Sequence, residues 1–370
     1  GLGDVYKRQV LGKWIIKDSN AVDFDFNILA EELVPSRVGS TLANCSGTVT
    51  PWNTIISCEE YTLDDVIVEI QKDYPWVTET IFKVDREPNG YDIYGWAIEI
   101  DPLTKEVIDQ DGGRNAQDKL WALGNFKHEN AVVHENRRTV YQGADATNGE
   151  GYLFKFVADQ AENLSSGDLY VYKGDKKTNH SWIQIANKTI AEQNSTRDQC
   201  AALGATSFGG IEDVEINPID GMIYFAVKRE LFVGVSGLGI VYRFKDTNAL
   251  DGSGLESFEI YAGNQSYEVL PGVFEPWGPG NDNLVFDSLG NLWVAQDGGN
   301  DYIWVVYNGH TQENPKVKIF AKTPAGSEPT GLTFSPDEKY IFMSIQHPSE
   351  SNNATSQKDA LGNDVFFDND

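Results

Sequence analysis

Short runs of β-branched and aromatic residues, each bounded by Gly, Asn, Asp or Pro, recur along this chain and constrain its fold more than any other feature. Three stretches share one pattern, an apolar pair, an Asp or Pro, a turn and an aromatic strand: EINPIDGMIYFAV (215–227), VFDSLGNLWVAQD (285–297) and TFSPDEKYIFMSI (333–345). Each predicts a β-hairpin, because Asp-Gly, Gly-Asn and Asp-Glu favour chain reversal. Hairpins that recur at intervals of tens of residues are typical of a β-propeller. We therefore predict an all-β propeller, with loop insertions that make the spacing irregular.

The remaining elements follow from the same reading. The clearest predicted strands are 95–100, 151–157, 168–172, 222–227, 239–244, 291–295 and 339–345. Helical periodicity is weak and confined to 62–72 and 189–193, and we expect surface loops at 176–179, 194–198 and 349–358. No linker divides the chain, so residues 10–370 are expected to form one domain.

The N-terminus needs separate treatment. Residues 4–9 read DVYKRQ, which matches a translated sequencing adapter, so we expect residues 1–9 to be an artefact and the natural N-terminus to be missing. The absence of a signal peptide therefore carries no information about export.

The charge of the chain limits its partners. There are 56 acidic and 29 basic side chains, a formal charge of −27, which opposes binding to nucleic acid or to an anionic membrane surface. No run of about 18 apolar residues is present, so no membrane insertion is expected. An anionic substrate would need bound cations to attract it, although a solvated acidic surface also explains the charge.

The segments NCSG (44–47), TPWNT (50–54) and SCEE (57–60) form the densest group of chemically capable residues. A thiolate beside two carboxylates can hold a metal ion. The alternative is a buried structural cysteine next to a surface pair of glutamates. The three cysteines, Cys45, Cys58 and Cys200, do not follow a zinc-finger spacing.

Seven segments between residues 44 and 350 resemble the PhoX-type alkaline phosphatases in content and order: TPWNTIISCEE, GWAIEIDP, LGNFKHE, GADATNGEGYLFKF, EDVEINP, NLVFDSLGNLWVAQDGG and GLTFSPDEKYIFMSIQHPSE. The resemblance implies a six-bladed β-propeller exported to the periplasm or the cell exterior. It also implies iron and calcium (Fe³⁺ and Ca²⁺) at one end of the channel, and hydrolysis of small phosphate monoesters. We expect a monomer.

The resemblance also implies site residues. Glu129 and Glu212 are expected to take part in catalysis as well as in metal binding. The full expected ligand set is Cys58, Glu59, Glu60, Glu129, Asp145, Glu212, Asp297 and Glu328. Carboxylates suit calcium and ferric iron, and a thiolate suits iron. Such a cluster would bind phosphate and lower the pKa of a bound water, so that a metal-bound hydroxide or oxo group would be the nucleophile.

The chain departs from the family at two places. Gly210 stands where the family has an arginine that can clamp phosphate, and Ala144 stands where it has an aspartate. Losing one bidentate contact costs about 2–4 kcal/mol of transition-state stabilisation, roughly 30-fold to 1000-fold in rate. Arg229, 19 residues beyond Gly210, is not expected to replace the missing arginine.

The histidines offer little else. For His347 a structural and a site role are equally open, and His134, His180 and His310 are expected at the surface.

Two other functions also remain open for the protein, a non-catalytic calcium-stabilised binding propeller and a calcium-dependent lactonase-like hydrolase.

Overall fold

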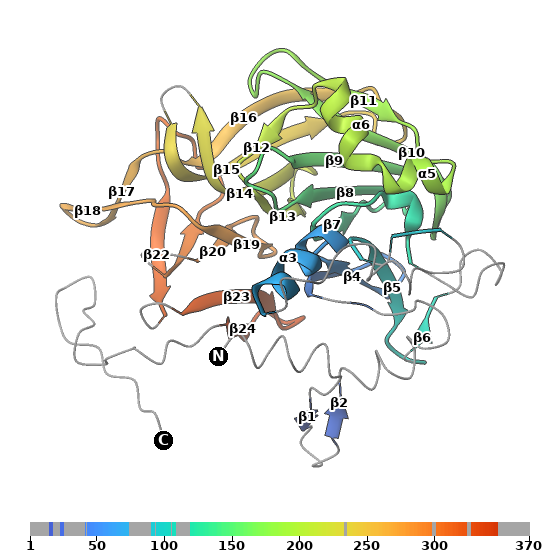
Figure 1. The fold of residues 1–370 in the computed structure, drawn as a ribbon. Coiled ribbons are helices and arrows are strands. Elements are labelled where there is room, and N and C mark those ends of the chain that lie inside the picture. Colours follow the sequence, from blue (N-terminus) through green and yellow to red (C-terminus); the bar gives the residue numbers. More distant parts are fainter. Residues whose placement is uncertain are drawn as a thin grey trace.

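The computed structural model is a β-propeller in which sheets are arranged around a common centre (Figure 1). It describes residues 15–17, 23–25, 41, 43–73, 90–92, 94–104, 106–108, 119–232, 235–297, 301–323 and 327–346.

Five sheets of antiparallel strands form the described part of the propeller. The first contains β3 (Asn44–Val49), β4 (Ile55–Glu59), β5 (Ala97–Asp101) and β6 (Glu106–Val107). The second contains β7 (His128–Val133), β8 (Thr139–Ala144), β9 (Gly151–Gln160), β10 (Asn163–Gly174) and β11 (His180–Ile185), and β12 (Ser207–Phe208) pairs with β9.

The third sheet contains β13 (Ile211–Ile216), β14 (Ile223–Phe232), β15 (Val235–Asp246) and β16 (Leu255–Gly263). The fourth contains β19 (Asn281–Phe286), β20 (Leu292–Gln296), β21 (Tyr302–Val306) and β22 (Val317–Lys322), and the fifth is β23 (Glu328–Phe334) with β24 (Ile341–Gln346). Separate hairpins are formed by β1 (Ile15–Lys17) with β2 (Asp23–Asp25) and by β17 (Ser266–Leu270) with β18 (Val273–Pro276).

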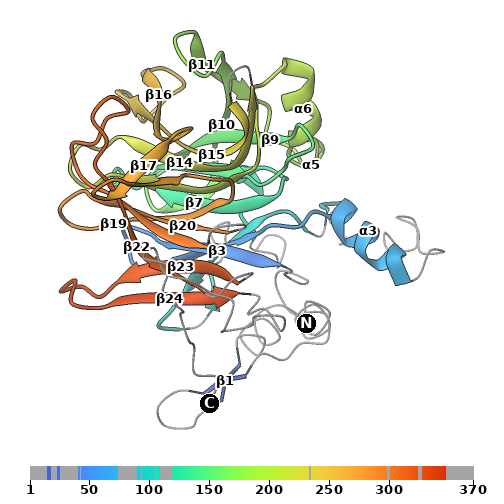
Figure 2. The same cartoon turned by 90° about the vertical axis from the view of Figure 1, so that its left-hand side faces the viewer.

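The described helices are α3 (Leu63–Asp73), α5 (Ile190–Asn194), α6 (Thr196–Leu203) and a 3-10 turn, η3 (Trp121–Leu123). Figure 2 shows α3 beside the sheets rather than between them. Ion pairs fasten α3 to its surroundings, from Lys127 to Asp65 (2.7 Å) and from Arg197 to Asp64 (3.0 Å). Among these helices, none has the length and apolar character that a bilayer crossing requires.

The first strand of each sheet lies at the centre, and these inner strands, β3, β7, β13, β19 and β23, contact one another in succession. Hydrogen bonds join four of them, β7, β13, β19 and β23. Asn130 on β7 donates to the Asp213 carboxylate on β13, and Asp213 accepts from the Leu284 amide on β19 (2.7 Å). Asn283 on β19 in turn accepts from the Gly331 amide on β23 (2.8 Å). We call this chain of contacts the inter-blade belt.

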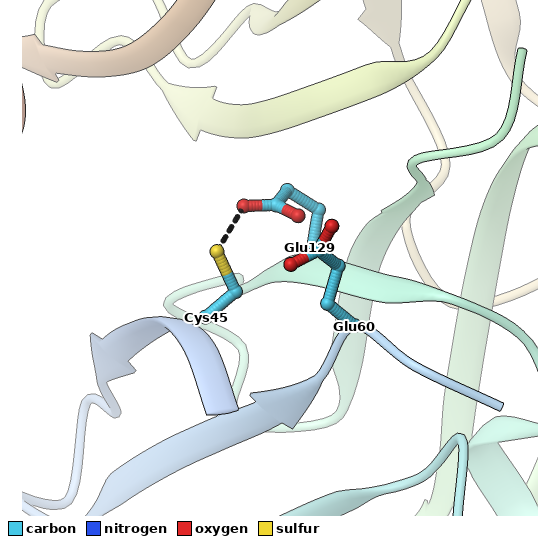
Figure 3. A group of neighbouring side chains, drawn as sticks. All are labelled: Cys45, Glu60 and Glu129. Carbon is cyan, nitrogen blue, oxygen red and sulfur yellow. Dashed lines mark hydrogen bonds between the residues drawn. The ribbon is translucent and has the colours of Figure 1, made fainter. Parts of the chain in front are cut away.

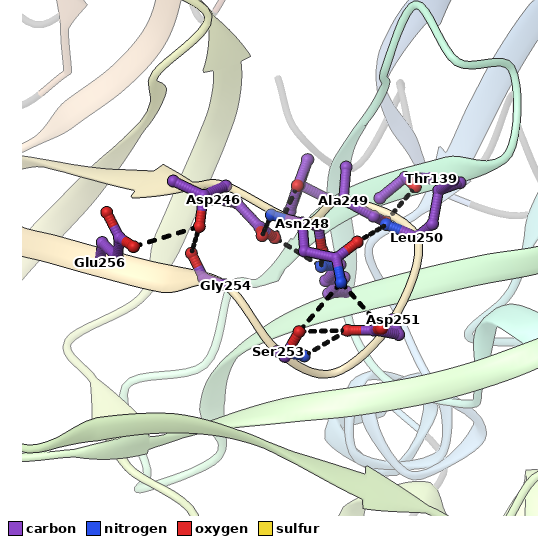
Figure 4. Close-up of polar contacts among 12 residues, drawn as sticks. Thr139, Asp246, Asn248, Ala249, Leu250, Asp251, Ser253, Gly254 and Glu256 are labelled. Carbon is purple, nitrogen blue, oxygen red and sulfur yellow. Dashed lines mark hydrogen bonds and ion pairs between the residues drawn. The ribbon is translucent and has the colours of Figure 1, made fainter.

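A second set of contacts joins the outer parts of two sheets. Lys155 on β9 donates to the Asp246 carboxylate (2.5 Å) and to the Asn248 carbonyl (2.9 Å), and the Thr139 hydroxyl donates to the Ala249 carbonyl (2.5 Å). Figure 4 shows the loop 247–254 that follows β15, with Thr139 beside it. The side chains of Lys155 and Asp246 are both fully buried, so this ion pair forms part of the packing between sheets.

The sequence predicted most of this secondary structure. The three hairpins are β13–β14, β19–β20 and β23–β24, and all the predicted strands and both predicted helices are present. The loop predicted at 194–198 is wrong except at Ser195, because α5 ends at Asn194 and α6 begins at Thr196. The helix α6 ends against Gly204, whose φ of 61° allows the left-handed cap. A helix of two turns is too short to show periodicity.

Other expectations have mixed outcomes. His310 is buried rather than exposed, because its Nε2 faces the Tyr261 carbonyl (2.9 Å) and its Nδ1 accepts from the Lys316 amide (3.0 Å). Residues 1–9, His347 and the loop at 349–358 lie outside the described residues. The described residues contain five radial sheets, so the count of six blades and the single-domain boundary remain predictions.

Candidate metal and active site

Each inner strand is interrupted by a register shift, a β-bulge or similar irregularity. The shifts fall between Asn44 and Gly47, His128 and Ala131, Ile211 and Asp213, Asn281 and Leu284, and Thr330 and Thr333. A bulge turns a side chain away from the regular alternation of a strand, and bulges are common next to active sites. Inside the first four shifts lie Cys45, Glu129, Glu212 and Asp282 respectively.

The four residues come together with Glu60, which directly follows β4. The Cys45 thiol donates a hydrogen bond to Glu129 Oε1 (2.7 Å), with Glu60 alongside, as Figure 3 shows. One potential ligand atom from each of these three residues lies within 4.8 Å of the others. Glu129, Glu212 and Asp282 form a second group by the same measure, so the two groups share Glu129. We call the five residues the acidic centre.

Three more carboxylates and one lysine border the acidic centre. Asp282 shares a hydrogen bond with Glu328, and the charge of Asp297 also acts on it. Lys228 on β14 forms ion pairs with Glu212 and with Asp145 Oδ2 (3.2 Å). The structure therefore brings together Glu60, Glu129, Asp145, Glu212, Asp297 and Glu328 from the predicted ligand set.

Several carboxylates lie buried and close together in the acidic centre, and this burial and closeness shift their pKa values. Burial, and then the neighbouring carboxylates, raise the pKa values of Glu129, Glu212 and Asp282 well above their usual range. Burial and Asp145 raise the pKa of Glu60 to about 7. Burial lowers the pKa of Lys228, but Glu212 and Asp145 outweigh it and hold that pKa above its usual range. A cation at the centre would relieve this repulsion.

The donor set fits metal ions. Glu129 Oε2 and Asp145 Oδ1 are buried and have no hydrogen-bond partner among the described residues. Buried polar atoms are normally satisfied, so oxygens of this kind are candidates for metal ligation. Several carboxylates suit calcium or ferric iron, and the single thiol at Cys45 suits iron. Cys45 is exposed as a residue. Desolvation of its thiol by the surrounding protein, and then the charges of Glu129 and Glu60, raise the pKa of the thiol.

Two predicted ligands, Cys58 and Glu59, are not members of the two ligand groups, although the charge of Glu129 acts on the Cys58 thiol. Cys58 is buried in the same hydrophobic cluster as Ala144 and pairs with Ala97 in the regular part of the β4–β5 ladder. Burial raises the pKa of its thiol. Glu59 is buried against the Lys119 ammonium (2.9 and 3.0 Å) and accepts from the Trp96 amide (3.1 Å). The contacts of Cys58 and Glu59 are those of structural residues, and their ligand role remains an untested prediction.

Sequence reasoning missed Cys45, Asp282 and Lys228 as site residues. A signal was present for Asp282. Three inner strands carry an acid followed by Asn or Asp, in the pairs 129–130, 212–213 and 282–283. In each pair the first residue belongs to the acidic centre and the second to the inter-blade belt. For Cys45 and Lys228 the sequence held no comparable repeat.

A cavity of about 410 Å³ adjoins the acidic centre through Asp145 and Lys228. It is lined by Lys127, Asp145, Ala146, Thr147, Asn148, Lys228 and Arg229. Arg229 therefore lies in the cavity beside the site, while the expectation that it does not replace the missing arginine stays an untested prediction. The β13–β14 hairpin carries it back, because the Arg229 amide donates to the Gly209 carbonyl (3.0 Å).

Comparison with known proteins identifies the family of the chain and structures that resemble it. The family described as "Alkaline phosphatase PhoX" matches residues 30–349. Among curated protein sequences, none matches. Among solved structures, the chain is similar to Pseudomonas fluorescens PhoX in complex with vanadate, a transition state analogue. The TM-score is 0.61 and the identity 26%, over 86% of this chain and 67% of that one. A Thermus thermophilus protein described as a putative oxidoreductase (glucose dehydrogenase) gives a TM-score of 0.34 at 11% identity, over 84% of this chain and 91% of that one, a likeness too low to carry an argument.

Proposed function

Because the chain belongs to the alkaline phosphatase PhoX family and is thus a phosphomonoesterase, we propose that its reaction takes place at the acidic centre. The observation that carries the proposal is the convergence of Cys45, Glu60, Glu129, Glu212 and Asp282 from four sheets within reach of common cations. Side chains this distant in sequence meet because register shifts in the inner strands turn them to the centre.

We propose two kinds of metal site. The group with the thiol, Cys45 with Glu60 and Glu129, suits Fe³⁺, and the all-oxygen group of Glu129, Glu212 and Asp282 suits Ca²⁺. In this proposal Cys45 takes the place first predicted for Cys58. Glu328, Asp297 and Asp145 surround these groups and complete the ligand supply.

Bound cations supply positive charge for the phosphate oxygens and lower the pKa of a bound water, which removes the need for a side-chain nucleophile. The protein holds the acids in place and excludes water. Glu129 and Glu212 are 2% and 3% exposed, so their carboxylates act in a medium where charge interactions are strong. The Lys228 ammonium keeps Glu212 oriented through its ion pair.

Family membership supports an exported protein, and we propose the periplasm or the cell exterior as its location. We further propose that it acts as a monomer on small phosphate esters. Size-exclusion chromatography with light scattering tests the oligomeric state.

The direct test of function uses the purified chain loaded with calcium and iron, with p-nitrophenyl phosphate as substrate between about pH 7 and 10. We expect phosphate release, and a loss of about 100-fold or more in Glu212→Gln. Glu162→Gln, an exposed carboxylate 43% accessible in a surface ion pair, is the matched control and is expected to keep full activity. Absence of phosphate release from the loaded protein would overturn the proposal. Calcium binding without turnover would then favour a binding module, and lactone turnover a lactonase.

A further inference from the structure

The backbone conformation of Gly210 and its closeness to Asp145 leave no room for an arginine at this position. The φ of Gly210 is +84°, a conformation that residues with side chains rarely adopt, and a Cβ there would lie 2.5 Å from Asp145 Oδ1. An arginine at position 210 and Asp145 in its present place therefore exclude each other. A positively charged side chain that binds the phosphate must therefore come from a position other than 210.

The neighbouring strand, β14, carries two positively charged side chains close to position 210. Across the ladder from Gly209 and Gly210 lie Arg229 and Lys228, joined through the Arg229 amide to the Gly209 carbonyl (3.0 Å) and the Lys228 amide to the Gly210 carbonyl (2.9 Å). Consecutive residues of a regular strand point to opposite faces. The β14–β15 pairing shifts register between Val227 and Glu230, and both Lys228 and Arg229 line the same cavity.

The three cations of the cavity differ in their partners. Lys127 is paired with Asp65 (2.7 Å), and Lys228 with Glu212 and Asp145. Arg229 is exposed, and within the described part of the chain its guanidinium has no carboxylate at ion-pair distance. A guanidinium can bind two oxygens of one phosphate at once.

We propose that Arg229 is the phosphate-binding arginine of this protein, supplied by β14 in place of the residue at position 210, with Lys228 beside it. The proposal rests on the proposed function and adds the residue that binds the phosphate group of the ester. The cavity next to the acidic centre holds this group, so that an ester phosphate lies between the guanidinium and the acidic centre. Inorganic phosphate, the product, occupies the same place by the same contacts.

The test compares Arg229→Ala, Arg229→Lys and a control, Arg137→Ala, which removes an exposed arginine in a surface pair with Glu162. Each metal-loaded protein is assayed for kcat/KM on p-nitrophenyl phosphate and for binding of inorganic phosphate by calorimetry. We expect a loss of about 100-fold in kcat/KM for Arg229→Ala, a smaller loss for Arg229→Lys, and none for the control. Phosphate binding should weaken in the same order, and added guanidinium ions should restore part of the activity of Arg229→Ala.

The outcomes separate this inference from the proposed function. If the wild-type chain is active and Arg229→Ala behaves like Arg137→Ala in both assays, the inference is wrong and the phosphatase assignment stands. If the wild type lacks turnover but binds phosphate in an Arg229-dependent way, the anion site stands and the proposed reaction falls. Gly210→Arg gives a second check. It should lower activity because it displaces Asp145, and a gain in activity would contradict the exclusion on which the inference depends.

Discussion

The buried pair of Lys119 and Glu59 allows a sharp test of how the segment SCEE works. The Lys119 ammonium contacts both carboxylate oxygens of Glu59 (2.9 and 3.0 Å), and both side chains are 0% exposed. Glu59 also accepts the Trp96 amide (3.1 Å). A carboxylate with these partners is neutralised by the protein itself, so we predict that Glu59 stabilises the fold and binds no metal.

The perturbation is Lys119→Met, which keeps the volume and removes the charge. Removing one partner of a buried ion pair leaves an uncompensated charge and costs about 3–5 kcal/mol. An unfolding entropy of about 2.1 cal/mol/K per residue over 370 residues gives about 0.8 kcal/mol/K. The expected fall in Tm is therefore about 4–6 °C. The exposed pair of Arg137 and Glu162, 48% and 43% accessible, is the control, and Arg137→Met should shift Tm by about 1 °C or less.

The assay is differential scanning calorimetry, with metal content measured on the same samples. Glu59→Gln should keep the wild-type metal content, and the double variant Glu59→Gln/Lys119→Met should be more stable than Lys119→Met alone, because no charge is then left unpaired. A Tm for Lys119→Met within about 1 °C of wild type would refute the reasoning about the buried pair. Loss of metal in Glu59→Gln would show that Glu59 is a ligand after all.

Three further predictions concern the metal ions and acid stability. Strong chelation should lower Tm, because the acids of the centre then repel one another without cations, and an unchanged Tm in calorimetry would argue against structural metal. Cys45→Ala should lose iron in elemental analysis, whereas Cys58→Ala should keep it and lose about 1 kcal/mol of stability; the reverse pattern would restore Cys58 as the ligand. Burial lowers the pKa of His310, so its neutral form stabilises the fold above the unfolded pKa of about 6.5, and this contribution is lost as pH falls through the lowered folded value. The Tm of the wild type should thus fall more steeply than that of His310→Gln between about pH 7 and 5; parallel curves would contradict this.

The fold was predictable because its signals are local. Each of the three hairpins is specified by a turn and two flanking strands within about a dozen residues, and turn chemistry does not depend on the rest of the protein. The helix α6 was missed because two turns, ended by Gly204, carry too little periodicity to be distinguished from a loop. The burial of His310 depends on contacts with Tyr261, 49 residues away, which no local pattern records.

The site was predictable only as a set of acids, because its details depend on register. Cys45 and Cys58 belong to neighbouring strands of one sheet. The β3–β4 pairing shifts between Asn44 and Gly47 and places Cys45 at the acidic centre. Cys58 lies opposite this shift on β4, but it keeps regular pairing with Ala97 on β5 and faces the core. A shift of one residue exchanges the two faces of a strand. The sequence alone cannot specify such a shift, so it could not choose between the two thiols.

The inter-blade belt explains how the protein holds mutually repelling acids close together. In the pairs 129–130, 212–213 and 282–283, the acid belongs to the centre and the next residue, Asn130, Asp213 or Asn283, binds the neighbouring sheet. Each acid is therefore anchored by a hydrogen bond one residue away. The bonds of Asn130 and Asp213 are buried, where a hydrogen bond is strong, and that of Asn283 is part-buried. The position of the ligands and the packing of the blades are thus set by the same backbone. A substitution in the belt, such as Asn130→Ala, should lower both Tm and metal content, whereas one in the outer ion pair of Lys155 and Asp246 should lower Tm alone.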